Sequence, residues 1–329
     1  MRNAVIRGTG AYLPKRVLPN TYFNETLGTD VDTWLRENLE IYERRWCEED
    51  ESTVDMAVAA AEQALDRAGI KAKDLDLIIV ATDTPEYLTP STAAVVQYRL
   101  GAGHAGTFDL NSACAGFVTS MDVGAKYIRT DDRYDYVLVI GAYAMSKFLD
   151  NKDKKTVTLF ADGAGAIVLG VEKDTDRGFL ASELVTLGQY HDGMGIYAGG
   201  AKRPVDEAVL EDEAQFLRIN YRMPPELNIQ IWSLMCRNLF KRLEMKPDDV
   251  ELFIFTQINV NSIRKTLDGL KLPHGKAHTV MHRYGYTGSA CIPIAFNDAL
   301  EKGKIAHGQT CIMVGSGSGL TFGSVAYRF

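Results

Sequence analysis

Residues 109–117 read Asp-Leu-Asn-Ser-Ala-Cys-Ala-Gly-Phe, and residues 284–292 read Tyr-Gly-Tyr-Thr-Gly-Ser-Ala-Cys-Ile. The tripeptide Ser-Ala-Cys therefore occurs twice, and a stretch with helical spacing of apolar residues begins at each copy. The same elements surround both copies in the same order: a helix, a buried strand, the tripeptide with its helix, and another buried strand. These segments are 52–70, 74–84, 110–128 and 136–144 in the first half, and 227–245, 249–259, 286–303 and 310–319 in the second.

The repeated order predicts the fold class. Strands that alternate with helices pair in parallel through right-handed crossovers, so we expect an α/β protein in which two similar halves pack together. The halves are predicted to span residues 1–172 and 173–329, because the polar, turn-forming segment 171–178 separates them. Gly141 and Gly315 are expected to end equivalent strands of the two halves.

Composition excludes several classes of protein. A chain of 329 residues with 46% hydrophobic content can bury a large core. Its net charge of −7 and its lack of long like-charged blocks argue against a nucleic-acid or membrane surface. Five cysteines without a Cys-x-x-Cys pair fit neither a disulfide framework nor a zinc site, so we predict no metal. With no apolar leader and no apolar run of about 20 residues, a soluble protein of the reducing cytoplasm is expected.

Cys114 is the candidate nucleophile. It directly precedes the predicted helix, and the positive end of a helix dipole lowers the pKa of a thiol. The small residues on both sides leave room for a substrate to approach. A buried structural cysteine is an equally good interpretation of the residue types alone. Packing roles are favoured for the other cysteines, Cys47, Cys236, Cys291 and Cys311.

Four segments give the sequence a family resemblance: 111–117, 159–166, 284–290 and 317–323. With flanking matches from Gly8 to Phe329, the chain resembles the β-ketoacyl-acyl-carrier-protein synthase III group of the thiolase superfamily. The resemblance implies a thiolase-like fold, in which duplicated βαβαβαββ halves form a five-layer αβαβα core, and a homodimer. It implies that Cys114 is the nucleophile and that backbone N–H groups of Cys114 and of the stretch around Gly317 form the oxyanion hole. No permanently bound cofactor is implied, and acyl-coenzyme A (acyl-CoA) or acyl-acyl-carrier-protein (acyl-ACP) is the implied thioester substrate.

Two catalytic positions of the family are altered. The family motif His-Gln-Ala-Asn reads Thr256-Gln257-Ile258-Asn259 here, and Gly-Asn-Thr reads Gly285-Tyr286-Thr287. Thr256 and Tyr286 therefore occupy the catalytic His and Asn positions, where they offer neutral donors without the acid–base range of an imidazole. His278 or His282 is an alternative source of the imidazole. Gln257 and Asn259 fit a functional and a structural role equally well.

The resemblance also implies a binding site for the thioester carrier. Trp34 matches the aromatic residue that stacks on the coenzyme A adenine, although a surface-helix anchor is the competing interpretation. Lys154 stands near the place of the partner arginine, Asn38 replaces a phosphate-binding arginine, and Pro224-Pro225 replaces a usual Asn-Gly. These changes favour a carrier-protein donor, which the basic cluster Lys152, Lys154 and Lys155 would meet unless it is simply a solvated charged surface.

The sequence therefore predicts an acyltransferase of the ketoacyl synthase III type, acting in fatty-acid-like or polyketide and other secondary metabolism. The predicted catalytic residues are Cys114, Thr256, Tyr286 and Gly317, and the predicted substrate-binding residues are Trp34, Lys154 and Asn259. The alternatives are a decarboxylative synthase that initiates fatty acids, and a non-catalytic subunit of a heterodimeric synthase. Segments 89–99 and 187–222 are expected to set the depth of the acyl pocket.

Overall fold

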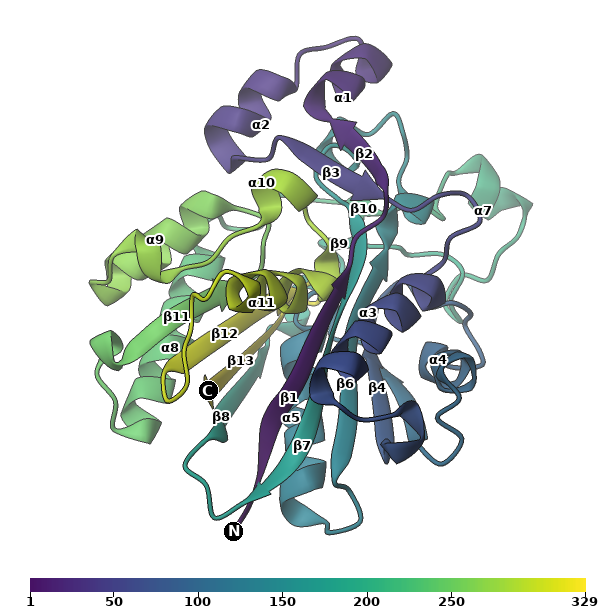
Figure 1. Cartoon of the computed structure of the whole chain (residues 1–329). Helices are drawn as coiled ribbons and strands as arrows, with labels where there is room; N and C mark the ends of the chain where they lie inside the picture. The colour runs from purple at the N-terminus through teal and green to yellow at the C-terminus, as the bar shows by residue number, and fades with distance from the viewer.

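Two β-sheets with a pair of helices between them form the centre of the computed structural model, which describes all 329 residues (Figure 1). The first sheet has the strand order β1-β7-β6-β4-β5. Its central strand β4 pairs in parallel with β5 and β6, and β7 runs antiparallel to β1 and β6. The strands are β1 (Arg2–Tyr12), β4 (Leu77–Ala81), β5 (Gly106–Leu110), β6 (Tyr136–Ala144) and β7 (Asp162–Lys173).

The second sheet has the order β11-β12-β13-β8 and repeats the pairing of the first. Its strands β11 and β12 are parallel, and β13 runs antiparallel to β12 and β8. A single parallel bridge between Phe253 and Ala277 occupies the place beside β11 that β5 has beside β4. The strands are β8 (Gly178–Thr186), β11 (Val250–Phe255), β12 (Thr310–Gly317) and β13 (Thr321–Arg328).

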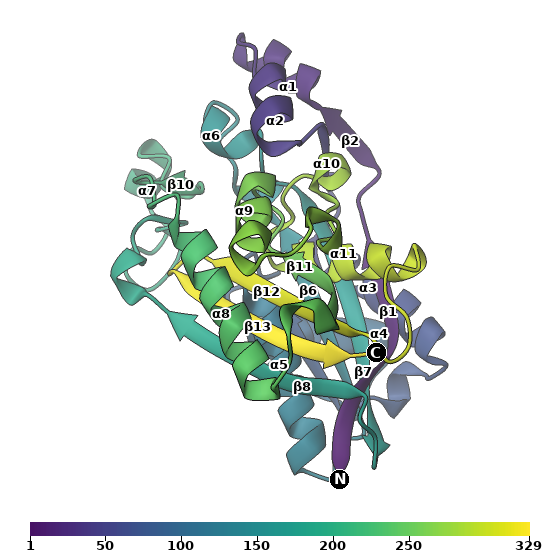
Figure 2. The same cartoon turned by 90° about the vertical axis from the view of Figure 1, so that its left-hand side faces the viewer.

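The helices complete five layers, which confirms the predicted αβαβα order. Helices α5 (Gly116–Thr130) and α11 (Cys291–Glu301) lie between the sheets and contact both. The outer face of the first sheet is covered by α3 (Thr53–Ala68) and α4 (Thr92–Leu100). Figure 2 looks onto α8 (Leu227–Leu243) and α9 (Val260–Leu270), which cover the second sheet.

Local sequence explains where these elements begin and end. The predicted helix 52–70 is α3, and Ser52 caps it, because its hydroxyl accepts a hydrogen bond from the Asp55 N–H while Asp55 accepts one from the Ser52 N–H. Gly69 ends the helix with φ 68°, a left-handed conformation that suits glycine. The predicted strand 136–144 is β6, and every residue after Tyr136 is buried, as expected for a strand covered on both faces.

Gly141 and Gly315 lie inside β6 and β12, so the expectation that they end these strands is wrong. Both positions are glycine because the other half of the chain approaches closely. A Cβ at Gly141 would lie 2.3 Å from the Ser289 carbonyl oxygen, just ahead of α11. A Cβ at Gly315 would lie 2.9 Å from Ala115 Cα, just ahead of α5. Each central helix thus begins against the equivalent strand of the opposite half.

Two insertions extend beyond the layers. The first holds β2 (Arg16–Pro19), α1 (Asn20–Leu27), α2 (Asp32–Leu39) and β3 (Glu43–Trp46), and the second, residues 187–226, holds β9 (Met194–Gly195), α7 (Glu207–Glu211) and β10 (Arg218–Ile219). Shorter helices are α6 (Lys154–Val157), α10 (Met281–Tyr284) and single turns at Ala72–Asp74, Met145–Phe148, Gly188–Tyr190, Pro247–Asp249, His274–Lys276 and Gly288–Ala290. The chain passes from the first sheet to the second between Lys173 and Gly178; the division into domains at residue 172 stays a prediction. None of the helices combines the length and apolar character needed to cross a membrane.

Candidate active site

Cys114 lies in a tight turn between β5 and α5. The Asn111 side chain accepts a hydrogen bond from the Ala113 N–H at 3.0 Å, and the Ser112 carbonyl accepts one from the Ala115 N–H at 3.1 Å. Ala113 adopts φ 46°, a left-handed conformation that costs a non-glycine residue of the order of 1–3 kcal/mol. The backbone hydrogen bonds of the turn leave the Cys114 N–H unpaired. The turn thus places both the thiol and a free N–H at the start of α5.

The surroundings of Cys114 keep its thiol protonated. Burial raises the pKa of Cys114 well above its usual value, the charge of Asp83 raises it further, and an interaction with the Tyr286 hydroxyl lowers it. Only 2% of Cys114 is exposed. The net direction for the free protein is therefore opposite to the expected lowering, because desolvation outweighs the effects of the Tyr286 hydroxyl and the Cys114 N–H, which lower this pKa.

Gly317, at the end of β12, contacts the backbone of Cys114. A Cβ at this position would lie 2.5 Å from Cys114 N and 2.9 Å from the Ser112 carbonyl oxygen. The next turn is held by the Thr321 hydroxyl, which donates a hydrogen bond to the same Ser112 carbonyl at 3.0 Å. The sequence prediction that Gly317 lies beside Cys114 agrees with this contact, and its role in catalysis remains a proposal.

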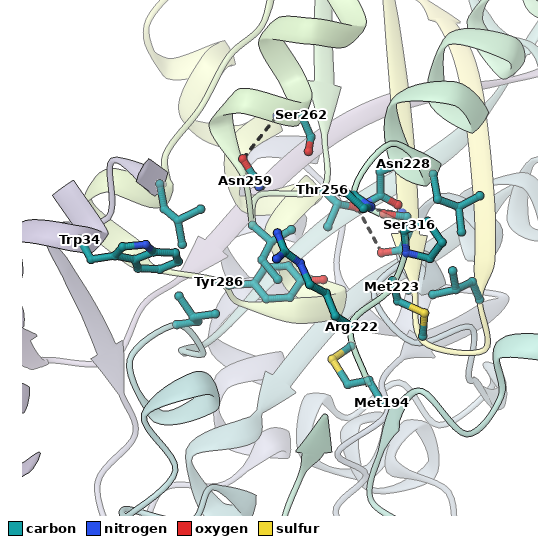
Figure 3. A pocket seen from close by; sticks show the side chains of 18 residues that line it. Trp34, Met194, Arg222, Met223, Asn228, Thr256, Asn259, Ser262, Tyr286 and Ser316 are labelled. Carbon is teal, nitrogen blue, oxygen red and sulfur yellow. Dashed lines mark hydrogen bonds between the residues drawn. The ribbon is translucent and has the colours of Figure 1, made fainter. Parts of the chain in front are cut away.

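Two cavities are lined by these residues, Gly317 in the first and Cys114 in the second. The first, here called the Tyr286 cavity, has a volume of about 380 Å³, and Trp34, Thr256, Tyr286 and Gly317 are among its lining residues (Figure 3). The second, here called the Cys114 cavity, has a volume of about 280 Å³ and contains the thiol. Met194 lines both. Cys114 therefore lines one cavity, Thr256 and Tyr286 line the other, and Met194 is common to both.

Thr256 is fully buried and already hydrogen-bonded on both sides. Its hydroxyl accepts a hydrogen bond from the Ser316 N–H at 2.8 Å and donates one to the Ser316 carbonyl at 3.3 Å. These bonds fix the end of β11 against the end of β12, immediately before Gly317. Thr256 can donate to a substrate only by giving up the Ser316 carbonyl, so its geometry suits a positioning residue.

Tyr286 interacts directly with the thiol. Its hydroxyl interacts with Cys114, and burial raises the pKa of the phenol well above its usual value. The ring packs against Phe160 with centroids 5.2 Å apart, and the Tyr286 backbone is held by hydrogen bonds with Leu159 and Ala161, both at 2.9 Å. Tyr286 therefore presents a neutral, rigidly held donor to Cys114.

The neighbouring polar residues have structural partners. Gln257 bridges the loop after β11, because its amide donates to the Phe255 carbonyl at 2.8 Å and accepts from the Val280 N–H at 2.9 Å. Asn259 lines the Tyr286 cavity and caps α9, where its side chain accepts from the N–H groups of the first turn. His278 is held 2.7 Å from Asp298, and burial lowers its pKa.

The two histidines proposed as substitute bases lie elsewhere. His278 and His282 line neither the Tyr286 cavity nor the Cys114 cavity. Burial lowers the pKa of His282, whose ring packs on Tyr42. The geometry therefore supplies no imidazole at Cys114.

Trp34 and Lys154 meet at a third cavity of about 460 Å³. Trp34 also lines the Tyr286 cavity, and 55% of the residue is exposed, so its ring lies at the entrance to both spaces. Lys155 lines the third cavity as well, while Asn38 instead donates its amide to the Trp34 carbonyl. The structure thus brings together the predicted substrate-binding residues Trp34 and Lys154, and places Asn259 further along the same path.

Sequence reasoning missed two charged residues. Asp83 lines the Cys114 cavity, and Arg222 lines the Tyr286 cavity, where Figure 3 labels it in front of Tyr286. Asp83 lies near the end of the predicted strand segment 74–84 and two residues after β4, and ligand sites form at the carboxyl ends of parallel strands, so that signal was available. Arg222 belongs to the irregular second insertion and carries no such signal.

The second insertion forms one wall of both cavities. Its residues Met194, Gly195, Ile196 and Leu217 line the Cys114 cavity, and residues 222–225 line the Tyr286 cavity. It is tied to the loop between β12 and β13, because Leu187 and Leu320 exchange two backbone hydrogen bonds and Ser318 donates to the Met194 carbonyl. Segment 89–99, the other predicted determinant of pocket depth, lines neither cavity.

Two packed α/β halves around these cavities define the class of thiolase-fold enzymes that transfer acyl groups. The family described as 3-oxoacyl-acyl-carrier-protein (ACP) synthase III matches residues 108–188, and its C-terminal part matches residues 240–329. A β-ketoacyl-acyl-carrier-protein synthase III from Geobacillus kaustophilus is 39% identical over 326 residues, and one from Staphylococcus epidermidis is 35% identical over 327, each covering 99% of both chains. The chain belongs to the 3-oxoacyl-ACP synthase III family, as its sequence motifs predict.

Solved structures confirm the thiolase-like fold. The crystal structure of 3-oxoacyl-ACP synthase III from Aquifex aeolicus is 34% identical, with a TM-score of 0.89 over 99% of this chain and 100% of that one. The priming β-ketosynthase of the R1128 polyketide pathway is 26% identical, with a TM-score of 0.89 over 100% of this chain and 96% of that one.

Proposed function

We propose that this protein takes an acyl group from an acyl-CoA or acyl-ACP thioester onto Cys114 and passes it to a second substrate. The observation that carries the proposal is the position of Cys114, which lies at the start of α5 beside an unpaired N–H and in direct contact with Gly317. A backbone N–H at this point can stabilise the oxyanion that forms when the thiolate attacks a thioester.

The proposed acylation balances without any other reagent. The Cys114 sulfur attacks the thioester carbonyl, the carbon–sulfur bond to the carrier breaks, and the proton of the Cys114 thiol ends on the departing carrier thiol. A nucleophilic acceptor then attacks the acyl-enzyme, and Cys114 recovers a proton from that acceptor. Because burial raises the pKa of the free thiol, only a small fraction of Cys114 is thiolate at neutral pH before the substrate enters.

Decarboxylative condensation is the second candidate activity. It is favoured by the full-length identity to relatives named β-ketoacyl-ACP synthase III. The altered positions favour transfer instead, because Thr256 is committed to Ser316 and Tyr286 offers a neutral hydroxyl where an enolate would need strong stabilisation. No histidine lines either cavity to complete the usual pair.

The carrier is proposed to reach Cys114 along the Tyr286 cavity. Trp34 lies at its entrance next to Lys154 and Lys155, and Arg222 lies further along. A flat aromatic surface followed by cations suits an adenine and phosphates, and it equally suits the phosphopantetheine of an acidic carrier protein. Asn259 would orient the donor at the Tyr286 end of this path.

A cytoplasmic homodimer is also proposed. Strand β5 lies at the edge of the first sheet, and an unpaired edge is a template for pairing with a second chain. On the adjoining segment, Leu88 is 83% exposed and Tyr98 is 82% exposed. We expect analytical ultracentrifugation to show a dimer for the wild-type chain and a monomer for the Leu88→Glu, Tyr98→Glu double variant; a monomeric wild-type chain would contradict this part of the proposal.

Incubation with thioesters separates the candidate activities. The protein is mixed with acetyl-CoA, acyl-ACP and malonyl-ACP, and intact mass and released carbon dioxide are followed, with Cys114→Ala as the control. A mass gain that maps to Cys114 without carbon dioxide supports transfer. Carbon dioxide that depends on Cys114 supports condensation, and the absence of an adduct with every donor overturns the proposed acylation.

A further inference from the structure

Asp83 is a carboxylate without a partner in the Cys114 cavity. It follows β4 by two residues and lines the same space as the thiol. Its Oδ1 is inaccessible to solvent and has no hydrogen-bond partner. Burial raises the pKa of Asp83 to about 6, so the group is still mostly ionised at neutral pH. One of the two carboxylate oxygens is therefore buried and unpaired, although the residue as a whole is partly exposed, and an ionised carboxylate in such a place is unfavourable unless a ligand compensates for it.

Asp83 makes no side-chain hydrogen bond to the scaffold at the end of β4, where its neighbours make the bonds. The Thr82 hydroxyl accepts from the Thr84 N–H at 3.0 Å, and the Thr84 hydroxyl accepts from the Ala144 N–H of β6 at 2.9 Å. The fold would keep these bonds with an apolar residue at position 83. The carboxylate is thus directed to the cavity and not to the scaffold.

The rest of the cavity offers Asp83 no cation. No lysine, arginine or histidine lines it. The Asn111 side-chain oxygen and the Thr321 hydroxyl are bonded within the turn at Cys114, and burial, followed by the charge of Asp83, raises the pKa of the Tyr143 phenol, which therefore stays neutral. Phe160 and Leu217 are among its apolar lining residues. A plain hydrocarbon chain would displace water from the carboxylate and leave it facing carbon.

We propose that the Cys114 cavity accepts a short acyl group that carries a hydrogen-bond donor, an ammonium or a hydroxyl, which pairs with Asp83. The inference rests on the proposed acylation of Cys114 and assigns its substrate class. A volume of about 280 Å³ lies just below the range of about 300–1,000 Å³ typical of pockets for drug-sized ligands, and so suits a short chain.

The pairing also couples substrate choice to reactivity. The charge of Asp83 is the second cause of the raised Cys114 pKa, after burial. An ammonium beside Asp83 neutralises that charge and favours the thiolate, whereas a methyl group in the same place does not. A matching acyl group therefore activates the nucleophile that receives it.

Three isosteric pantetheine thioesters test the proposal: β-alanyl, 3-hydroxypropionyl and butyryl, which end in an ammonium, a hydroxyl and a methyl group. The rate of Cys114 acylation is measured by intact mass and divided by the rate with free N-acetylcysteine, which corrects for intrinsic reactivity. In the wild-type protein we expect at least one donor-bearing thioester to react tenfold or more faster than butyryl. Asp83→Asn should reduce an ammonium preference to within about twofold, and exposed Asp132→Asn is the matched control.

The outcomes are distinct. A fast β-alanyl reaction supports the ammonium, and a fast 3-hydroxypropionyl reaction alone supports the hydroxyl. Butyryl transfer that equals or exceeds both overturns the inference but leaves the acylation intact, and this comparison in the wild-type protein needs no variant to fold. If no thioester reacts, the proposed function fails, but the inference can still be tested with the amides that correspond to the three thioesters and cannot transfer their acyl group. The inference is supported if an amide with an ammonium or a hydroxyl protects Cys114 from iodoacetamide better than the butyryl amide does. It is refuted if the three amides protect equally or not at all.

Discussion

Replacing Gly317 with alanine probes the contact on which the proposed acylation depends. The added Cβ would lie 2.5 Å from Cys114 N, 2.8 Å from Ala113 Cβ and 2.9 Å from the Ser112 carbonyl oxygen. Ordinary contacts begin at 3.4 Å, so the two backbones must separate by about 0.9 Å, and none of these atoms can rotate away. Overpacking of this kind costs about 1–3 kcal/mol of stability. A shift of about 1 Å at a reacting group costs roughly 10²-fold in rate.

We therefore expect Gly317→Ala to fold, to lose about 1–3 kcal/mol of unfolding free energy, and to acylate Cys114 about 100-fold more slowly. Urea unfolding measures the first effect, and intact mass after rapid mixing with the best thioester measures the second. Gly103→Ala is the matched control, because nothing lies within 4 Å of its added Cβ. Acylation within twofold of the wild-type rate would refute the assignment of Gly317 to the reacting site.

Four further predictions concern the same region. Thr256→Val should lower the unfolding free energy by about 1–3 kcal/mol in urea titrations, because it leaves two buried Ser316 groups unpaired, whereas Thr256→Ser should not; equal stability of the two variants argues against that role. Thr256→His with Tyr286→Asn should raise carbon dioxide release from malonyl thioesters above that of either single variant, and no gain contradicts the importance of the altered pair. Because the pKa of Asp83 rises from 3.8 in the unfolded chain to about 6 on folding, the wild-type protein loses stability as this group ionises between about pH 4 and pH 6. Asp83→Asn should avoid that loss, so its advantage in unfolding free energy grows across the window to at most about 3 kcal/mol, and a pH-independent difference opposes the burial argument. Alkylation of Cys114 by iodoacetamide should accelerate about tenfold per pH unit up to pH 9, since the pKa of the thiol lies well above 9.0; a plateau below pH 8 contradicts this.

The fold followed from local patterns that burial and capping enforce. The apolar run of β6 and the serine that caps α3 appear in the sequence as they act in the structure, because strand burial and helix capping depend on neighbouring residues. The role of Asn259 as the cap of α9 was readable in the same way, from its place just before Val260. Its structural function is clear from the geometry, while a role toward substrate stays a prediction.

The chemistry of the site depended on contacts that no local pattern encodes. Thr256 is bonded to Ser316, sixty residues further along the chain, and that pairing exists only because β11 and β12 are neighbours. The helix N-terminus at Cys114 is visible in the sequence and favours a low pKa, but burial, which tertiary structure imposes, has the larger effect. Asp83 was overlooked because it stands out only by the missing hydrogen-bond partner of its Oδ1. The sequence does not show which side chains lack a partner, since the fold determines which groups come together.

The attachment of the second insertion to the loop after Gly317 limits how this enzyme can diversify. Leu187 and Leu320 hold the two segments together through paired backbone bonds, and Ser318 adds a third link to Met194. Insertions or deletions in residues 187–226 would move the loop that contacts the nucleophile, so mutations that reshape the pocket by changing chain length carry a catalytic penalty. Evolution toward new acyl groups is therefore expected to proceed by exchanging side chains that face the cavity, with the backbone length of this segment preserved among active descendants.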